Sequence, residues 1–88
     1  MHVVVELRFG PEPERLALRP AHREKLAALH AEGRLVMAGP FADESGALLV
    51  FDVASEEALD AVLADDPYYA APGTTVVRRQ PWTPLFTP

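Results

Sequence analysis

Six short segments with the hydrophobic patterns of strands and helices follow one another along this chain of 88 residues. Residues 2–9 alternate between two side-chain sets with a period of two, which is typical of a strand with one buried face. Apolar residues then recur every three or four positions up to Glu32, and Gly33 is a helix stop signal. Because Pro20 interrupts this pattern, we expect a short helical turn, a kink and a main helix from about Pro20 onward.

Residues 35–41 and 47–53 read as two further strands, and the polar turn between them predicts a hairpin. Ser55 is a predicted N-cap for a second helix, which Pro67 should end. Residues 74–80 form the last predicted strand, followed by an irregular tail.

The resulting order, β-α-β-β-α-β, predicts an α+β protein with the ferredoxin-like arrangement: a four-stranded antiparallel sheet with two helices on one face. Residues 1–88 are expected to form a single domain. The chain is too short to bury a large core, and it has no cysteine with which to form disulfides.

Both hairpin strands are apolar on both of their faces, over residues 35–38 and 47–51. The helices can cover only one face of the sheet, and the other face would be polar if it met water. We therefore expect a homodimer in which the uncovered faces of two sheets pack back to back.

The formal net charge is -5, with 8 Lys and Arg against 13 Asp and Glu, and there is no basic run. A polyanion would be repelled, so no nucleic-acid partner is expected. No stretch resembles a signal peptide or is apolar for long enough to span a bilayer, so we expect no membrane association and a location in the bacterial cytoplasm.

His22 is the first candidate for chemistry, because it shares a helical face with Leu26 and Leu29 and should point inward. Asp66 lies four residues after Val62 and would continue the inward face of the second helix. A carboxylate at a helix C-terminus costs up to about 1 kcal/mol, so Asp66 needs a partner, and His22 is the obvious one. Such a pair is an acid–base unit in which the carboxylate raises the basicity of the imidazole. Alternatively, His22 is a core histidine bonded to backbone, and Asp66 only caps the Asp-Pro turn.

Four further residues are candidates for substrate binding. Arg8 lies on the even face of the first strand and could bind an anionic group, although pairing with Glu6 or with an acid across the interface is the simpler role. Tyr68 could form the wall of a pocket or simply pack at a helix end. Gly39 and Pro40 permit a close backbone approach where a strand ends.

Other chemistries find little support in the sequence. Ser45 lies in a polar turn and Ser55 at a helix cap, so a serine nucleophile with a triad is not expected. The three histidines, His2, His22 and His30, have no metal-ligand spacing. No glycine loop could hold a phosphate group, and we expect no cofactor.

Several short motifs occur in a familiar order: Phe9-Gly10-Pro11, Arg19-Pro20-Ala21-His22, Gly33-Arg34-Leu35, Ala38-Gly39-Pro40, Asp65-Asp66-Pro67-Tyr68 and Pro81-Trp82. With these motifs the chain resembles the YciI-like (YCII-related) family over nearly its whole length. The resemblance implies a ferredoxin-like subunit of a dimeric α+β barrel, with an active site around His22 and Asp66. Some members of this family are dehydrochlorinases that eliminate chloride from a chlorohydroquinone without a cofactor, and others are domains fused to regulatory proteins.

Two functions are therefore expected from the sequence. In the first, the protein is a cofactor-independent lyase or isomerase of dehydrochlorinase type that acts on a small aromatic or carbonyl-activated molecule. His22 would move the proton, Asp66 would orient His22, and Arg8 would stabilise an oxyanion or hold a ring substituent. In the second, the protein is a non-catalytic small-molecule-binding or assembly module that uses the same pocket. A weaker third possibility is a haem or aromatic monooxygenase, but a haem would need His22 free of Asp66.

Overall fold

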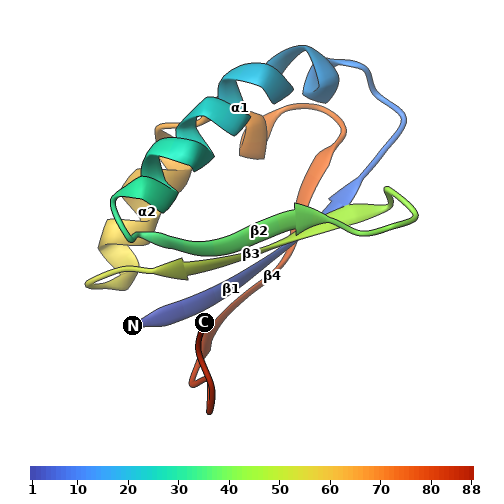
Figure 1. Cartoon of the computed structure of the whole chain (residues 1–88). Coiled ribbons are helices and arrows are strands. Elements are labelled where there is room, and N and C mark those ends of the chain that lie inside the picture. The colour runs from blue at the N-terminus through green and yellow to red at the C-terminus, as the bar shows by residue number, and fades with distance from the viewer.

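The computed structural model describes residues 1–88 and has the expected order of strands and helices. In sequence order the elements are β1 (His2–Phe9), α1 (Glu14–Ala31), β2 (Leu35–Pro40), β3 (Gly46–Asp52), α2 (Glu56–Ala64), the short 3-10 helix η1 (Pro67–Ala70) and β4 (Thr74–Trp82). The strands form one antiparallel sheet in the order β2-β3-β1-β4, and α1 and α2 lie on the same side of it (Figure 1). This arrangement is the predicted ferredoxin-like α+β fold. None of the helices combines the length and the hydropathy that a bilayer-spanning segment requires.

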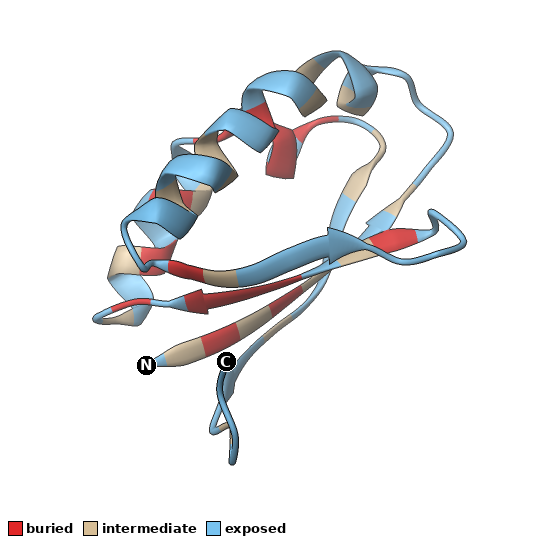
Figure 2. Ribbon diagram, viewed as in Figure 1, coloured by how far each residue is buried: buried red, intermediate tan, exposed pale blue.

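The core lies between the helices and the two central strands, β1 and β3 (Figure 2). Val3, Val5 and Leu7 on β1 are fully buried or nearly so, as the period-two pattern predicts. Phe51 on β3 and Leu59 on α2 are also fully buried. The alternation of side chains along the strands therefore decides which face of the sheet meets the helices.

Helix α1 differs from the prediction, because it runs without a break from Glu14 to Ala31 with Pro20 inside it. Proline lacks the N–H that would bond to the carbonyl of Leu16, four residues earlier. Leu16 and Pro20 are both exposed, so water can satisfy that carbonyl. The expected separate short first helix before Pro20 was therefore wrong.

The C-terminal end of α1 is as predicted. Gly33 adopts a φ of +79°, a left-handed conformation that glycine tolerates best. Its N–H donates to the carbonyl of His30 at 3.1 Å, and the N–H of Arg34 donates to the carbonyl of Leu29 at 2.9 Å. These two bonds make a Schellman motif, which closes the helix and directs the chain into β2.

Helix α2 ends earlier than expected. Ser55 is the N-cap, as predicted, and its Oγ accepts the N–H of Ala58 at 3.1 Å. The helix ends at Ala64, so Asp66 lies outside it and does not continue its inward face. Instead Asp66 caps η1, which begins at Pro67. The predicted position of Asp66 on α2 was therefore wrong, because the Asp-Pro sequence starts a new turn here.

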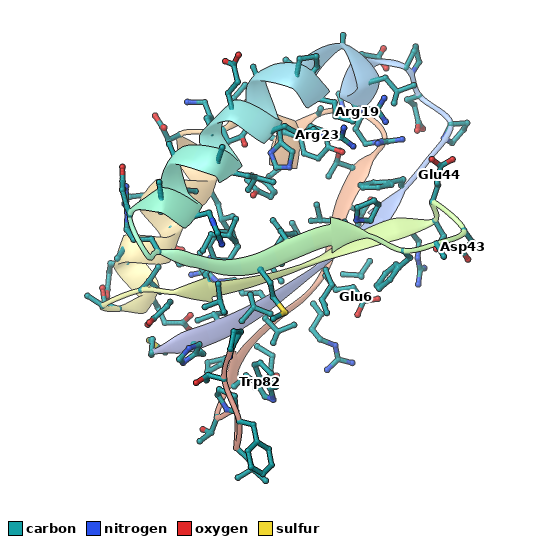
Figure 3. The ribbon with its side chains drawn as sticks, in the orientation of Figure 1. Glu6, Arg19, Arg23, Asp43, Glu44 and Trp82 are labelled. Carbon is teal, nitrogen blue, oxygen red and sulfur yellow. The ribbon has the colours of Figure 1, made fainter.

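The face of the sheet that is turned away from the helices carries apolar side chains that are exposed in the single chain. Met37, Leu48 and Trp82 on this face are 51%, 38% and 48% exposed. A register shift pairs Leu35 with Phe51 but Met37 with Val50, so Leu35 points to the core and Met37 away from it. Figure 3 shows Glu6 and Trp82 on this outer side.

Strand β4 is two residues longer than predicted at its C-terminal end, since it continues through Pro81 to Trp82. Proline is tolerated there because β4 is an edge strand, with only β1 beside it. The tail that follows, residues 83–88, is irregular, and Leu85 and Phe86 in it are each 89% exposed.

Candidate functional site

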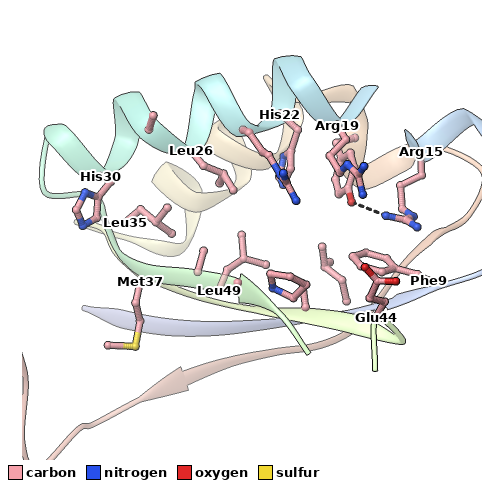
Figure 4. A pocket seen from close by; sticks show the side chains of 18 of the residues that line it. Phe9, Arg15, Arg19, His22, Leu26, His30, Leu35, Met37, Glu44 and Leu49 are labelled. Atoms are coloured by element: carbon pink, nitrogen blue, oxygen red, sulfur yellow. Dashed lines mark hydrogen bonds between the residues drawn. The ribbon is translucent and has the colours of Figure 1, made fainter. Parts of the chain in front are cut away.

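A cavity of about 750 Å³ opens between α1 and the hairpin strands β2 and β3 (Figure 4). Its apolar lining includes Leu7 from β1, Leu26 from α1 and Leu49 from β3. Helix α1 also contributes His22 and His30, and η1 contributes Tyr68. The cavity is therefore apolar over the sheet, and its polar side chains come mainly from the helix.

His22 and Asp66, the two predicted catalytic residues, are in direct contact. Nδ1 of His22 lies 2.6 Å from Oδ2 of Asp66, and both residues are about 95% buried, with exposures of 6% and 5%. The other carboxylate oxygen, Oδ1, accepts the backbone N–H of Tyr68 at 3.0 Å. A carboxylate can only accept, so Nδ1 of His22 carries the hydrogen and donates it. In the neutral imidazole, Nε2 is then the nitrogen with a free lone pair.

The His22 ring is also held by two aromatic side chains. Tyr68 stacks on it with 3.8 Å between the ring centroids and an interplanar angle of 6°. Tyr69 meets it edge-on, with the centroids 5.3 Å apart. Aromatic packing and the bond to Asp66 together leave the imidazole little rotational freedom. The capping role and the pairing role of Asp66, which the sequence left as alternatives, occur together.

Burial lowers the pKa of His22 below its ordinary value of 6.5, and the nearby Arg23 guanidinium acts in the same direction. The hydrogen bond and the charge of Asp66 act against this shift but do not overcome it. Asp66 therefore raises the basicity of the imidazole, as predicted, but desolvation is the larger effect and the pKa of His22 is lowered overall. At neutral pH the imidazole is neutral, which is the state that can accept a proton.

Tyr69 is the second buried group with a shifted pKa. Burial raises its pKa far above the ordinary value, and the charge of Asp66 adds to the shift. Its hydroxyl is buried and has no hydrogen-bond partner in the chain. Tyr69 therefore stays protonated and serves as packing for the imidazole.

Arg15 belongs to the site, although the sequence analysis did not identify it. Its Nη1 donates to the hydroxyl of Tyr68 at 3.1 Å, and its guanidinium carbon lies 3.8 Å from the centre of the Phe9 ring. Arg15, Arg19 and Arg23 all line the cavity. Their spacing of four residues places them on one helix face, so this periodicity was the signal in the sequence that could have revealed them.

The remaining predicted residues divide between the two sides of the sheet. Gly39, Pro40 and Tyr68 line the cavity. Arg8 does not line it, because it follows Leu7 on β1 and points to the opposite face, where it has no ion-pair partner within the chain. Glu6, its suggested partner, lies 3.7 Å from Arg78 instead. No three His, Cys, Asp or Glu side chains converge closely enough to hold a metal ion.

The protein is therefore an α+β protein with a ferredoxin-like fold, in which a buried His–Asp pair lies beside an open cavity. The family model of the YCII-related domain matches residues 1–83, and the chain belongs to that family. It is 36% identical over 83 residues to "Protein YciI" of Escherichia coli O6:H1 and to that of Shigella flexneri, which covers 83% of this chain and 85% of each relative.

A solved structure with a similar fold is the 5-chloro-2-hydroxyhydroquinone dehydrochlorinase of Burkholderia phenoliruptrix in complex with 2,5-dihydroxybenzoquinone. The TM-score is 0.76 and the sequence identity is 19%, and the match covers 94% of each chain. At this level of identity, the similarity establishes the fold.

Proposed function

We propose that this protein is a cofactor-independent lyase of dehydrochlorinase type, in which His22 acts as the general base on a small aromatic or carbonyl-activated molecule. The observation that carries the proposal is the buried His22–Asp66 pair at the wall of the cavity. Its geometry leaves Nε2 as the proton acceptor. The pKa of His22 favours the neutral ring at physiological pH.

The proposed reaction is an elimination. Nε2 of His22 takes a proton from the substrate, the electrons of the broken bond form a new double bond, and chloride leaves with its bonding pair. The imidazolium that forms is stabilised by Asp66 through the existing 2.6 Å contact and then returns its proton to water. The substrate loses one proton and one chloride, so the step balances without an oxidant or a reductant.

Two further features support this reaction class. The apolar lining formed by Leu7, Leu26 and Leu49 suits a planar ring. The fold is shared with a protein that is a dehydrochlorinase, which makes the same chemistry a reasonable first candidate here.

The test measures chloride release from 5-chloro-2-hydroxyhydroquinone by the wild-type protein, by His22→Gln and by His2→Gln. His2 is a matched control because it lies on β1 and does not line the cavity. We expect turnover by the wild type and by His2→Gln, and a loss of about 100-fold or more in His22→Gln. Full turnover in His22→Gln would disprove the role of His22. A ligand that raises the melting temperature but yields no product would favour the binding module instead.

We also propose that two copies pair through the outer face of the sheet. The exposed Met37, Leu48 and Trp82 support this pairing, because a small chain gains stability by covering such a face. Light scattering should give the mass of a dimer at micromolar concentration, and Leu48→Glu should shift the protein toward the monomer. A wild-type monomer under these conditions would contradict the proposal.

A further inference from the structure

The basic residues of this chain fall into two groups according to their partners. Four of the 8 Lys and Arg residues form ion pairs: Lys25 with Asp65, Arg34 with Glu32, Arg78 with Glu6, and Arg79 with Glu56 and Asp60. The other four, Arg8, Arg15, Arg19 and Arg23, have no acidic partner within 4.0 Å. Three of these four line the cavity beside His22. Unpaired positive charge is therefore concentrated at this one site.

The acids of the chain avoid the same cavity. The whole chain carries 13 Asp and Glu and a net charge of -5, yet Glu44 is the only acid among the residues that line the cavity. Three arginines outnumber Glu44 and the Asp66 carboxylate behind His22, so the cavity is positive within an acidic protein. A cleft with low-dielectric walls focuses such a field, so an anion would be attracted specifically to this opening.

The three arginines differ in the contacts that their side chains make within the chain. Arg15 is held by Tyr68 and Phe9. Arg19 is half-buried and Arg23 is exposed, and neither makes a side-chain hydrogen bond or an ion pair within the chain. They are one helical turn apart, about 6 Å along the axis, and His22 belongs to the same turn (Figures 3 and 4).

We propose that Arg19 and Arg23 bind an oxyanion of the ligand, a carboxylate or an ionised phenol carried on an apolar ring. A guanidinium group offers a planar fork of N–H donors that suits such an oxygen pair, and both groups are free to use it. The ring then lies against the apolar lining with its reacting atom near His22. This inference deepens the proposed function, on which it rests, by naming the substrate as an anion.

The test compares two probes of equal shape and different charge, benzoate and benzamide, by NMR titration of the backbone amides. Benzoate should bind more tightly than benzamide by about tenfold, because only the carboxylate carries a negative charge and offers two acceptor oxygens to the guanidinium groups, whereas the amide offers one neutral oxygen. Its affinity should fall as salt is added, whereas that of benzamide should not. Equal affinity for the two probes, or no saturable benzoate binding at millimolar concentration, would overturn the inference.

Single substitutions then test which residues are responsible for the preference for benzoate. Arg19→Gln and Arg23→Gln should each weaken benzoate binding by about fivefold and leave benzamide binding unchanged. Glutamine is a good helix former, so α1 should be retained, and circular dichroism checks this. Arg34→Gln removes the same charge from an exposed residue that does not line the cavity, and it should bind benzoate as the wild type does. An equal loss in Arg34→Gln would mean that only the overall charge matters, which would refute a specific site.

The result of the benzoate-binding experiment can be distinguished from the result of the chloride-release experiment. Benzoate should still bind to His22→Gln, because the anion contacts are made by the arginines. If benzoate binding depends on Arg19 and Arg23 while His22→Gln keeps full turnover, the anion site stands and the role of His22 as the base fails. If chloride release requires His22 but benzoate and benzamide bind equally, the reaction stands and the anion site fails.

Discussion

Replacing Asp66 with asparagine should move the ring hydrogen of His22 from Nδ1 to Nε2. The same substitution should lower the stability of the fold only moderately. In the wild type, both carboxylate oxygens accept: Oδ2 from Nδ1–H of His22 and Oδ1 from the N–H of Tyr68. Asparagine has the same shape but one oxygen and one NH₂ group. The oxygen can keep the bond from Tyr68 only if the NH₂ group faces His22. His22 must then accept at Nδ1, which moves its hydrogen to Nε2 and removes the proposed base.

The cost to stability follows from the bonds that are exchanged. A charge-assisted hydrogen bond contributes about 1.5–3 kcal/mol and a neutral one about 0.5–1.5 kcal/mol, so Asp66→Asn should lower the free energy of unfolding by about 1–2 kcal/mol. In a chain of this size, that loss corresponds to a fall in melting temperature of about 4–15 °C. Turnover should fall by about 10³-fold or more, because the protonated Nε2 cannot act as a base.

Nitrogen NMR of the imidazole reports the tautomer directly, and urea denaturation reports the stability. The matched control is Asp65→Asn, the adjacent aspartate, whose exposed carboxylate contacts Nζ of Lys25 at 3.1 Å. Such a surface pair contributes about 0.5 kcal/mol or less, so the control should be nearly as stable as the wild type and keep its tautomer. The reasoning would be refuted if His22 in Asp66→Asn kept its hydrogen on Nδ1, or if both variants lost the same stability.

Three further predictions concern stability and are measured by urea denaturation. Lowering the pH from about 7 to about 5 should reduce the free energy of unfolding, because burial lowers the pKa of folded His22 below 6.5 and the unfolded chain therefore binds the proton first. His22→Gln should flatten that part of the pH profile. Gly46→Ala should cost more than about 2 kcal/mol, because the new Cβ would lie 2.0 Å from the carbonyl oxygen of Leu7, whereas Gly39→Ala meets no atom within 4 Å and should be nearly neutral. Ser55→Ala should cost about 1 kcal/mol through the loss of the N-cap of α2.

Each of these predictions has an outcome that contradicts it. A stability that stays constant over this pH range, or a slope that persists in His22→Gln, would show that His22 does not control the effect. Equal stabilities of Gly46→Ala and Gly39→Ala would mean that β1 can move away from β3 without cost. An unchanged Ser55→Ala would show that the start of α2 is held by packing alone.

The strands and helices could be predicted because their signals are local. Side-chain alternation in residues 2–9, the glycine at the end of α1 and the serine at the start of α2 each act through bonds or packing within a few residues. The inward position of His22 also followed from helical periodicity, and α1 does bury it. The prediction failed at Pro20, because whether a helix tolerates a proline depends on the exposure of the carbonyl that the proline leaves without a partner.

The chemistry of the site depended on contacts between segments far apart in the chain. Periodicity could nominate Asp66, but only the 3-10 turn after α2 shows how one carboxylate serves both Tyr68 and His22. The direction of the pKa shift of His22 is a balance between burial and charge, and burial is set by the packing of α1 against η1 rather than by neighbouring residues. The grouping of Arg15, Arg19 and Arg23 was already visible as a spacing in the sequence. That the three face a cavity with a single acid was decided by the tertiary structure, because a spacing places residues on one face of a helix but does not show what that face meets.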